Sequence, residues 1–208
     1  MARAEAQARV VEALAADGYA IEPDYLDWEA VRNLREHLQK LAKQGLLVPG
    51  GIGRGAARAA RREIRGDRIR WLGDEPEDRS ELSLFAALED LRALINRELM
   101  LGLVDFEGHY ALYPPGARYA LHRDRFRDDD ARVLSLVLYL NAFWQTADGG
   151  QLRFHVGDGT TREVPPVAGT LVAFLSERFE HEVLPAARER MAIAGWFRRR
   201  GAGLETRG

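Results

Sequence analysis

Cysteine is absent from the 208 residues of this chain, which excludes disulfides, thiolate metal ligands and a cysteine nucleophile. An excess of charge of either sign is also absent, because 30 basic and 32 acidic residues give a formal net charge of −2. That balance provides no global attraction to nucleic acid or to an anionic membrane. No apolar run approaches a membrane span, and charged residues interrupt any signal-peptide core at the N-terminus. We therefore expect a cytoplasmic protein with neither nucleic acid nor membrane as a partner.

The composition is that of a soluble globular protein, with 46% hydrophobic and 30% charged residues. A chain of this length can bury one sizeable core, so we expect a single domain over residues 1–208. Apolar residues recur at helical spacing in three segments of the first hundred residues. The pattern predicts a helix that ends at Asp17-Gly18, a helix from Trp28 to about Gly45, and a helix from Ser80 to about Leu99, with Ser80 as its candidate cap.

The second half of the chain has the short apolar segments and turn signals of strands. Val133–Asn141 reads as a buried strand, and Pro114-Pro115-Gly116 reads as a turn that leads into a strand. Asp158-Gly159 offers a two-residue hairpin turn. Further predicted strands are Gly149–Phe154, Gly169–Phe174, His181–Ala186 and Arg190–Phe197.

One triplet, His122-Arg123-Asp124, carries the strongest chemical signal. In an extended strand residues i and i+2 point to the same face, so His122 and Asp124 can present an imidazole and a carboxylate to one point. A second imidazole from a distant strand, His181, would complete two histidines and one carboxylate. That set occupies one face of an octahedral metal and leaves positions open, as in non-haem Fe(II) oxygenases. An H-x-D triplet alone arises often by chance.

Three features around the triplet carry a family resemblance. The first is the set of H-x-D, His181 and, nine positions later, Arg190; the second is Tyr139-Leu140-Asn141 with Gly149-Gly150-x-Leu152. The third is Ile64-Arg65-Gly66-Asp67-Arg68-Ile69-Arg70-Trp71. Residues from about 64 to 197 thereby resemble the 2-oxoglutarate- and Fe(II)-dependent prolyl hydroxylases, in particular the branch that acts on the hypoxia-inducible transcription factor and its small bacterial relatives.

The resemblance implies a mainly β fold with N-terminal helices: a double-stranded β-helix, which is a jelly-roll, cupin-like barrel, buttressed by about three α-helices. Residues 1–100 would supply the helical support and a finger loop near 55–75, and residues 101–200 the catalytic barrel. It also implies Fe(II) as the metal, 2-oxoglutarate and O₂ as cosubstrates, and ascorbate as a candidate stimulant. Oxidative decarboxylation of 2-oxoglutarate would yield succinate and CO₂ and drive hydroxylation of a C–H bond.

The resemblance also assigns roles to residues. His122, Asp124 and His181 would hold the iron. The planar fork of Arg190 would pair with the far carboxylate of 2-oxoglutarate, and an interior arginine without an anionic partner would carry a large desolvation cost. The remaining implied cosubstrate contacts are Tyr139, Tyr113, Leu152 and Trp196. Without the resemblance, the favoured interpretation of Tyr139 and Trp196 is that they are core aromatics with a satisfied polar tip.

The substrate is the least determined part of the prediction. In the branch that the chain resembles, the segment matching residues 64–71 lies beside a peptide-gripping loop, so Arg65, Asp67 and Trp71 are candidate substrate contacts or loop supports. Arg132 is expected to contact substrate at the same entrance and to pair with Asp67. We predict a dioxygenase of the prolyl 4-hydroxylase type that acts on a proline in a partner protein, with a translation factor as one candidate.

Two alternatives remain open from the sequence. One is a hydroxylase of small molecules or free amino acids, and the other is a non-catalytic metal-binding sensor or adaptor on the same barrel. The Gly- and Arg-rich segment 48–62 reads either as a solvated loop or as a basic flap for an acidic partner. The remaining histidines, His37, His109 and His155, have no partners at ligand spacing and are expected to be surface or packing residues.

Overall fold

A computed structural model of the chain describes residues 2–51, 61, 63–73, 76, 78–124, 131–157 and 159–200. Its helices are α1 (Ala2–Asp17), α2 (Trp28–Lys43), α3 (Arg79–Leu99) and the 3-10 helix η2 (Thr146–Asp148). Its strands are β1 (Tyr19–Glu22), β2 (Val48–Pro49), β3 (Arg68–Trp71), β4 (Leu103–Tyr113), β5 (Tyr119–His122), β6 (Arg132–Tyr139), β7 (Leu152–Gly157), β8 (Thr160–Val164), β9 (Leu171–Leu175), β10 (Glu180–Val183) and β11 (Arg190–Arg199).

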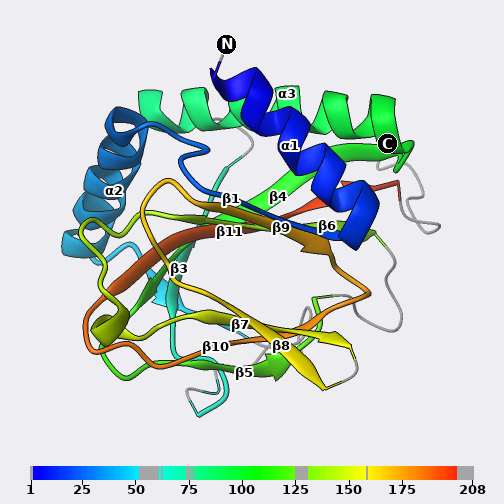
Figure 1. Cartoon of the computed structure of the whole chain (residues 1–208). Helices are drawn as coiled ribbons and strands as arrows, with labels where there is room; N and C mark the ends of the chain where they lie inside the picture. The colour runs from blue at the N-terminus through cyan, green and yellow to red at the C-terminus, as the bar shows by residue number, and fades with distance from the viewer. Residues whose placement is uncertain are drawn as a thin grey trace.

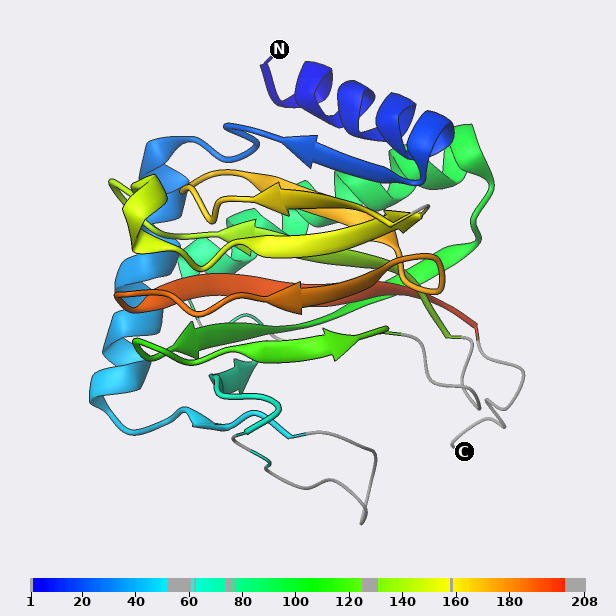
Figure 2. The ribbon, with the colours of Figure 1, turned by 60° about the horizontal axis from the view of Figure 1, so that its bottom comes forward.

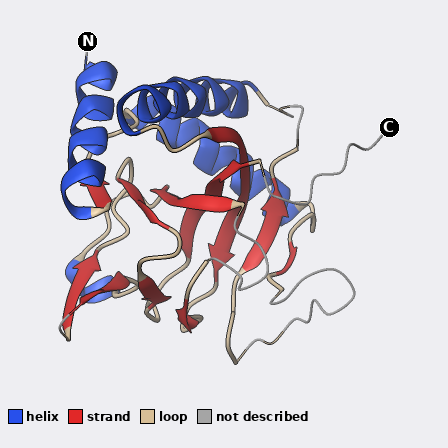
Figure 3. Cartoon of the chain, turned by 90° about the vertical axis from the view of Figure 1, so that its right-hand side faces the viewer, coloured by secondary structure: helices blue, strands red, loops and turns tan. Residues whose placement is uncertain are grey.

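The strands form two sheets that face each other, as Figure 1 and the rotated view in Figure 2 show. The larger sheet has the order β1-β9-β6-β11-β4-β3-β2, and the smaller has the order β5-β10-β7-β8. Each pairing between these strands is antiparallel. The helices lie over one side of the strands (Figure 3). This arrangement confirms the predicted double-stranded β-helix with three supporting helices.

The two faces of the larger sheet bury different sets of side chains, because successive residues of a strand point to opposite faces. Along β11, Met191, Ile193 and Phe197 pack into the core shared with the helices. Ala192, on the opposite face, packs into the smaller core between the two sheets. Full burial of a side chain such as Phe197 stabilises the fold by roughly 1.5–3 kcal/mol, so this alternation holds the helices on the outer face and leaves the inner face for the site.

The helices begin and end largely where the sequence predicts. The side chain of Asp27 caps α2 by accepting a hydrogen bond from the Ala30 amide at 2.8 Å. The predicted cap of α3 is wrong by two residues. Asp78 is the cap, and its carboxylate accepts hydrogen bonds from the amide and the hydroxyl of Ser80, at 2.8 and 2.6 Å. A carboxylate at the N-terminus of a helix satisfies free amides and also opposes the positive end of the helix dipole.

Three predicted features fall partly outside the described residues. One is the Asp158-Gly159 turn, of which Asp158 is not described. Of the Gly- and Arg-rich segment 48–62, residues 52–60 and 62 are not described. Of the expected finger loop near 55–75, the described part includes β3, which pairs with β4 along the edge of the larger sheet. No helix among the described residues is long and apolar enough to span a membrane.

Candidate active site

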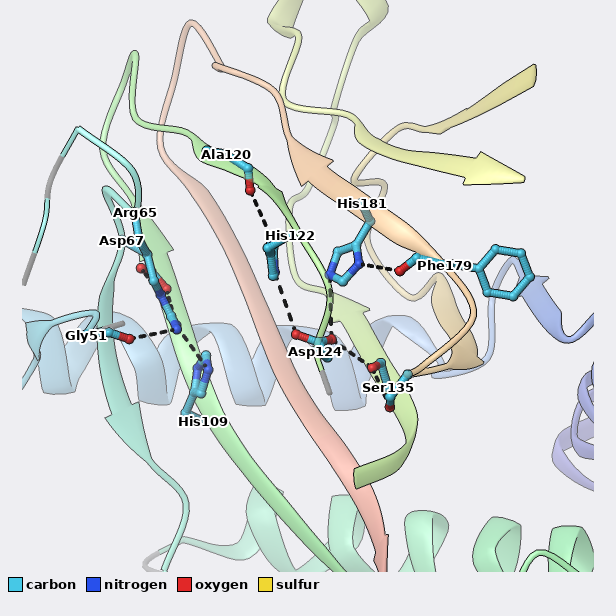
Figure 4. Close-up of polar contacts among 11 residues, drawn as sticks. Gly51, Arg65, Asp67, His109, Ala120, His122, Asp124, Ser135, Phe179 and His181 are labelled. Atoms are coloured by element: carbon cyan, nitrogen blue, oxygen red, sulfur yellow. Dashed lines mark hydrogen bonds and ion pairs between the residues drawn. The ribbon is translucent and has the colours of Figure 1, made fainter. Parts of the chain in front are cut away.

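The three predicted metal ligands meet on the smaller sheet (Figure 4). Strand β5 ends at His122, which pairs in register with His181 of β10, and Asp124 lies in the bend that follows β5. The Asp124 carboxylate oxygens lie 3.6 Å from His122 Nε2 and 3.5 Å from His181 Nε2. All three ligand atoms lie within 4.8 Å of one another. Ligands of one ion are about 3 Å apart, so the cluster has the size of a metal site.

Backbone carbonyls fix both imidazoles in the orientation that a metal requires. His122 Nδ1 lies 2.8 Å from the Ala120 carbonyl oxygen, and His181 Nδ1 lies 3.3 Å from the Phe179 carbonyl oxygen. A carbonyl only accepts, so each Nδ1 carries the proton and donates it. Each Nε2 therefore presents its lone pair to the common point. Hydrogen bonds of this kind orient the ligands of protein metal sites.

The carboxylate ligand is oriented by two serines that the sequence analysis did not identify. Ser135 of β6 donates its hydroxyl to Asp124 Oδ2 at 2.7 Å. The hydroxyl oxygen of Ser176 lies 2.9 Å from that of Ser135. Both serines are buried. Because Ser135 donates its proton to the carboxylate, Ser176 is the donor between the two hydroxyls. These two successive hydrogen bonds fix the orientation of the Asp124 carboxylate.

The protonation states also suit a divalent cation. Burial would raise the pKa of Asp124, but His181, His122 and Ser135 outweigh it and hold the pKa of this carboxyl below its usual range. Burial lowers the pKa of His181 to about 4, against the attraction of Asp124. A metal binds an ionised carboxylate and neutral imidazoles. At neutral pH Asp124 and His181 are therefore ready to bind an ion without losing protons.

Arg190, at the start of β11, is a buried cation with 2% of its surface exposed. Its Nε donates to the Gly150 carbonyl at 2.9 Å, and its guanidinium lies 5.2 Å from the Tyr113 ring and 5.1 Å from the Tyr139 ring. Among the described residues, neither Arg190 Nη2 nor the Tyr139 hydroxyl has a hydrogen-bond partner. Burial raises the pKa of Tyr139 to about 12, so it keeps its proton. Two unsatisfied buried donors side by side fit an anionic ligand such as a carboxylate.

A cavity of about 360 Å³ connects these groups between the two sheets. Small inward-facing residues of β4 and β11, Ala111, Ala192 and Ala194, leave room for it, and the volume suits a small ligand. Most residues selected from the sequence line it: Arg65, Trp71, Tyr113, His122, Asp124, Arg132, Leu152, His181, Arg190 and Trp196. The two remaining selected residues, Asp67 and Tyr139, each contact a residue that lines the cavity. Asp67 is bonded to Arg65, and Tyr139 lies beside Arg190.

The remote end of the cavity carries charged pairs, one of which differs from the prediction. Arg65, not Arg132, pairs with Asp67, through two hydrogen bonds of 2.7 and 2.9 Å. Arg132 pairs with Glu107 at 3.1 Å, and its guanidinium lies 3.4 Å from the centre of the Trp196 ring. Arg65 is only two residues from Asp67 along the chain, whereas Arg132 of β6 lies beside Glu107 of β4. Trp196 thus lies near Arg132, six positions along β11 from Arg190.

The remaining histidines differ in their surroundings. His109 is buried and lines the cavity, which the expectation of a surface or packing residue did not anticipate. The local spacing gave no signal for this position, because its neighbours come from other strands. His37 belongs to α2, and its Nε2 lies 3.3 Å from the carboxylate of Glu81 of α3. His155 is partly buried on β7.

Comparison with known proteins agrees with this geometry. A model of the 2OG-Fe(II) oxygenase superfamily matches residues 108–198. Human prolyl hydroxylase EGLN3 is 31% identical over 170 residues, which are 78% of this chain and 70% of the relative. A Pseudomonas putida prolyl-4-hydroxylase of known structure is 48% identical, with 94% of this chain and 100% of that chain covered and a TM-score of 0.85. A Trichoplax adhaerens prolyl hydroxylase is 27% identical, and the match covers 95% of this chain and 90% of that chain with a TM-score of 0.86. That structure contains a peptide fragment of the hypoxia-inducible factor oxygen degradation domain. The chain therefore belongs to the 2OG-Fe(II) oxygenase superfamily, and within it to the dioxygenases of the prolyl 4-hydroxylase type, whose cofactors are Fe(II) and 2-oxoglutarate.

Proposed function

We propose that this enzyme hydroxylates a prolyl residue in a partner protein, with succinate and CO₂ as coproducts. One observation carries the proposal: one cavity is lined both by the cluster of His122, Asp124 and His181 and by Arg190, whose Nη2 has no hydrogen-bond partner among the described residues. The same cavity is lined at its far end by the mouth, which we define as Arg65, Trp71, Arg132 and Trp196. The proposal treats residues 1–208 as one domain, since the helices share a core with the barrel.

His122, Asp124 and His181 would hold Fe(II), which when bound would supply open positions for 2-oxoglutarate and for O₂, the oxidant of the reaction. Arg190 would pair with the far carboxylate of 2-oxoglutarate through Nη2, which has no partner in the part of the chain that the structure describes, and Tyr139 would donate its hydroxyl to the same carboxylate. Other cosubstrate contacts in the proposal are Tyr113 and Leu152, which line the cavity. Trp196 also lines the cavity, but it lies beside Arg132, too far along β11 from Arg190 to contact the same 2-oxoglutarate.

A peptide substrate is supported by the opposite end of the cavity. Trp71 and Arg132 line it and are proposed to contact the peptide beside Arg65. Asp67 has no exposed side chain, so it would act by holding Arg65 rather than by touching substrate. The Trichoplax adhaerens relative was crystallised with a peptide, and we infer the same class of ligand here. A translation factor is one candidate target.

The test is a mass-spectrometric screen for proline residues that gain one oxygen. Proteins of a cell extract would be incubated with Fe(II), ascorbate and 2-oxoglutarate, with the wild-type enzyme or with the His181→Ala variant as the matched control. We expect hydroxyproline in a small set of proteins only with the wild-type enzyme, together with stoichiometric succinate. Hydroxylation of free amino acids or other small molecules, with no protein modified, would instead establish a small-molecule hydroxylase.

A further inference from the structure

His109 of β4 is a buried histidine that the site described above does not use. It has 2% of its surface exposed and lines the cavity. Its cross-strand partner on β3 is Trp71, whose ring meets the imidazole edge-on at 5.1 Å. The ring of Trp196 lies 5.9 Å from the imidazole at an angle of 61°. The imidazole therefore contacts both tryptophans of the mouth.

The hydrogen bonds of His109 define one tautomer. His109 Nε2 lies 3.3 Å from Arg65 Nη2, as Figure 4 shows. A guanidinium only donates, so Nε2 accepts. His109 Nδ1 lies 3.2 Å from the carbonyl oxygen of Tyr110, which only accepts, so Nδ1 carries the proton. Both contacts are satisfied only by a neutral imidazole protonated at Nδ1.

Arg65 connects this histidine to the rest of the site. Its guanidinium donates two hydrogen bonds to Asp67, points toward the Gly51 carbonyl oxygen at 3.4 Å, and lies 4.9 Å from the centre of the Tyr119 ring. Tyr119 in turn stacks on the metal-ligand imidazole of His122 with 3.7 Å between ring centres. A change in the position of Arg65 would thus alter both the mouth and the wall next to the metal cluster.

We propose that His109 is a positioning residue for the peptide substrate. As a neutral imidazole it accepts the hydrogen bond from Arg65 and packs against the rings of Trp71 and Trp196, which also lie 6.4 Å from each other. The peptide-binding mouth is therefore complete only while His109 is unprotonated. This inference rests on the proposed function, because it assigns a role in binding the prolyl peptide. It predicts that acid weakens peptide binding through one identifiable group.

The charges around His109 support a neutral state. Arg65 and Arg132 face it as cations, and Asp67 and Glu107 are the nearby carboxylates, each already paired with an arginine. Burial and Arg65 lower the pKa of His109 to about 4, with Asp67 acting in the opposite direction. Protonation would change Nε2 from an acceptor into a donor that faces the Arg65 donor. The hydrogen bond would be lost, and two positive charges would lie together.

Two variants separate the hydrogen bond from the packing. His109→Gln keeps an acceptor at the end of the side chain and cannot titrate, whereas His109→Leu fills similar space without an acceptor. The probe is a synthetic peptide that carries the proline identified in the extract screen. We expect His109→Leu to raise the KM for this peptide at least tenfold, with a much smaller change in the KM for 2-oxoglutarate. His109→Gln should return the peptide KM to within a few-fold of wild type.

The pH profile gives the decisive comparison. In the wild type, the peptide KM should rise as the pH falls toward 4, and this rise should be absent from His109→Gln. His155→Leu is the matched control, because that histidine does not line the cavity, and it should leave both KM values unchanged. An unchanged peptide KM in His109→Leu, or an acid-side rise that persists in His109→Gln, would overturn the inference.

A measurement without peptide distinguishes failure of this inference from failure of the proposed function. The ¹⁵N NMR shifts of the His109 ring at pH 7 should show a neutral imidazole protonated at Nδ1, whichever substrate the enzyme uses. A ring protonated at Nε2, or at both nitrogens, would refute the role of His109 even if a prolyl substrate is found. Absence of hydroxyproline in the extract screen would refute the proposed function while leaving the His109 geometry to be judged by this spectrum.

Discussion

Replacement of Arg190 by lysine is the sharpest test of the proposed cosubstrate site. The change keeps a positive charge but replaces a planar fork by a single ammonium group. In the wild type, Nε is occupied by the Gly150 carbonyl, and Nη2 has no partner among the described residues. A lysine ammonium would have to choose between the carbonyl and the ligand. We therefore expect binding of 2-oxoglutarate to weaken without loss of the local positive charge.

The magnitude follows from the hydrogen bonds at stake. A hydrogen bond to a charged group contributes about 1.5–3 kcal/mol, and each 1.4 kcal/mol changes affinity about tenfold. Loss of one such bond predicts a rise in the Kd of 2-oxoglutarate of roughly tenfold to a hundredfold. Complete loss of binding would be too large for this reasoning, because the metal would still contribute to binding of the other end of the cosubstrate.

Calorimetric titration of 2-oxoglutarate into Mn(II)-loaded protein under anaerobic conditions would measure this effect without turnover. The matched control is Arg188→Lys, two residues away. Arg188 pairs with Asp148 at 3.4 Å, lies over the Trp144 ring and does not line the cavity. The control should bind 2-oxoglutarate like the wild type. A Kd that is the same in Arg190→Lys as in the wild type would show that another cation binds the far carboxylate.

Four further changes test the site, the mouth and the pH response. His181→Ala should abolish Fe(II) binding while circular dichroism stays native, and full activity in this variant would refute the metal assignment. Ser135→Ala should weaken Fe(II) binding about tenfold to a hundredfold in a chelator competition, and Ser135→Thr, which keeps the hydroxyl, should not. The double change Asp67→Ala with Trp71→Ala should lower peptide hydroxylation about a hundredfold through misplacement of the substrate, so a folded double variant with a normal rate would favour a small-molecule substrate. The pKa of His109 is about 4 in the folded state, whereas a histidine in the unfolded chain takes up its proton below about pH 6.5. Between pH 7 and pH 4 the wild type should therefore lose up to roughly 3 kcal/mol more unfolding free energy than His109→Leu, as measured by urea titration. Equal losses of unfolding free energy in the two proteins would contradict this.

The metal cluster was predictable because strand geometry relates local spacing to position in space. A triplet H-x-D puts two side chains on one face, and the hairpin-rich second half of the chain can return a distant histidine to the same place. The details differ from a regular strand. Strand β5 ends at His122, so Asp124 is placed by the bend and by the Ser135 hydroxyl rather than by strand periodicity. No sequence pattern predicts the contact between Ser135 and Asp124, which forms only when the strands pair.

The features that sequence reasoning missed depend on contacts between distant segments. Strand β4 was not predicted, because its inner face carries Glu107, His109 and Tyr113 around a cavity instead of a regular apolar alternation. The environment of His109 is made by β3, β4 and β11 together. The pairing of Arg132 was also set by the fold, which brings it to Glu107 on β4. Local propensity contains none of this information, which arises only when the strands pair.

Strand β11 lines the cavity from one end to the other. Its inward-facing positions include Arg190, Ala192, Ala194 and Trp196, and all four line the cavity. At about 3.3 Å per residue, Arg190 and Trp196 are separated by roughly 20 Å along the strand. The small residues between them leave space beside the metal cluster, and in the proposed site the position of Arg190 would determine where 2-oxoglutarate lies. In the proposal, selection of the substrate would fall to the far end of the cavity, which Arg65, Trp71 and Arg132 line. Substitutions there should change which proline is hydroxylated while the barrel keeps the same chemistry.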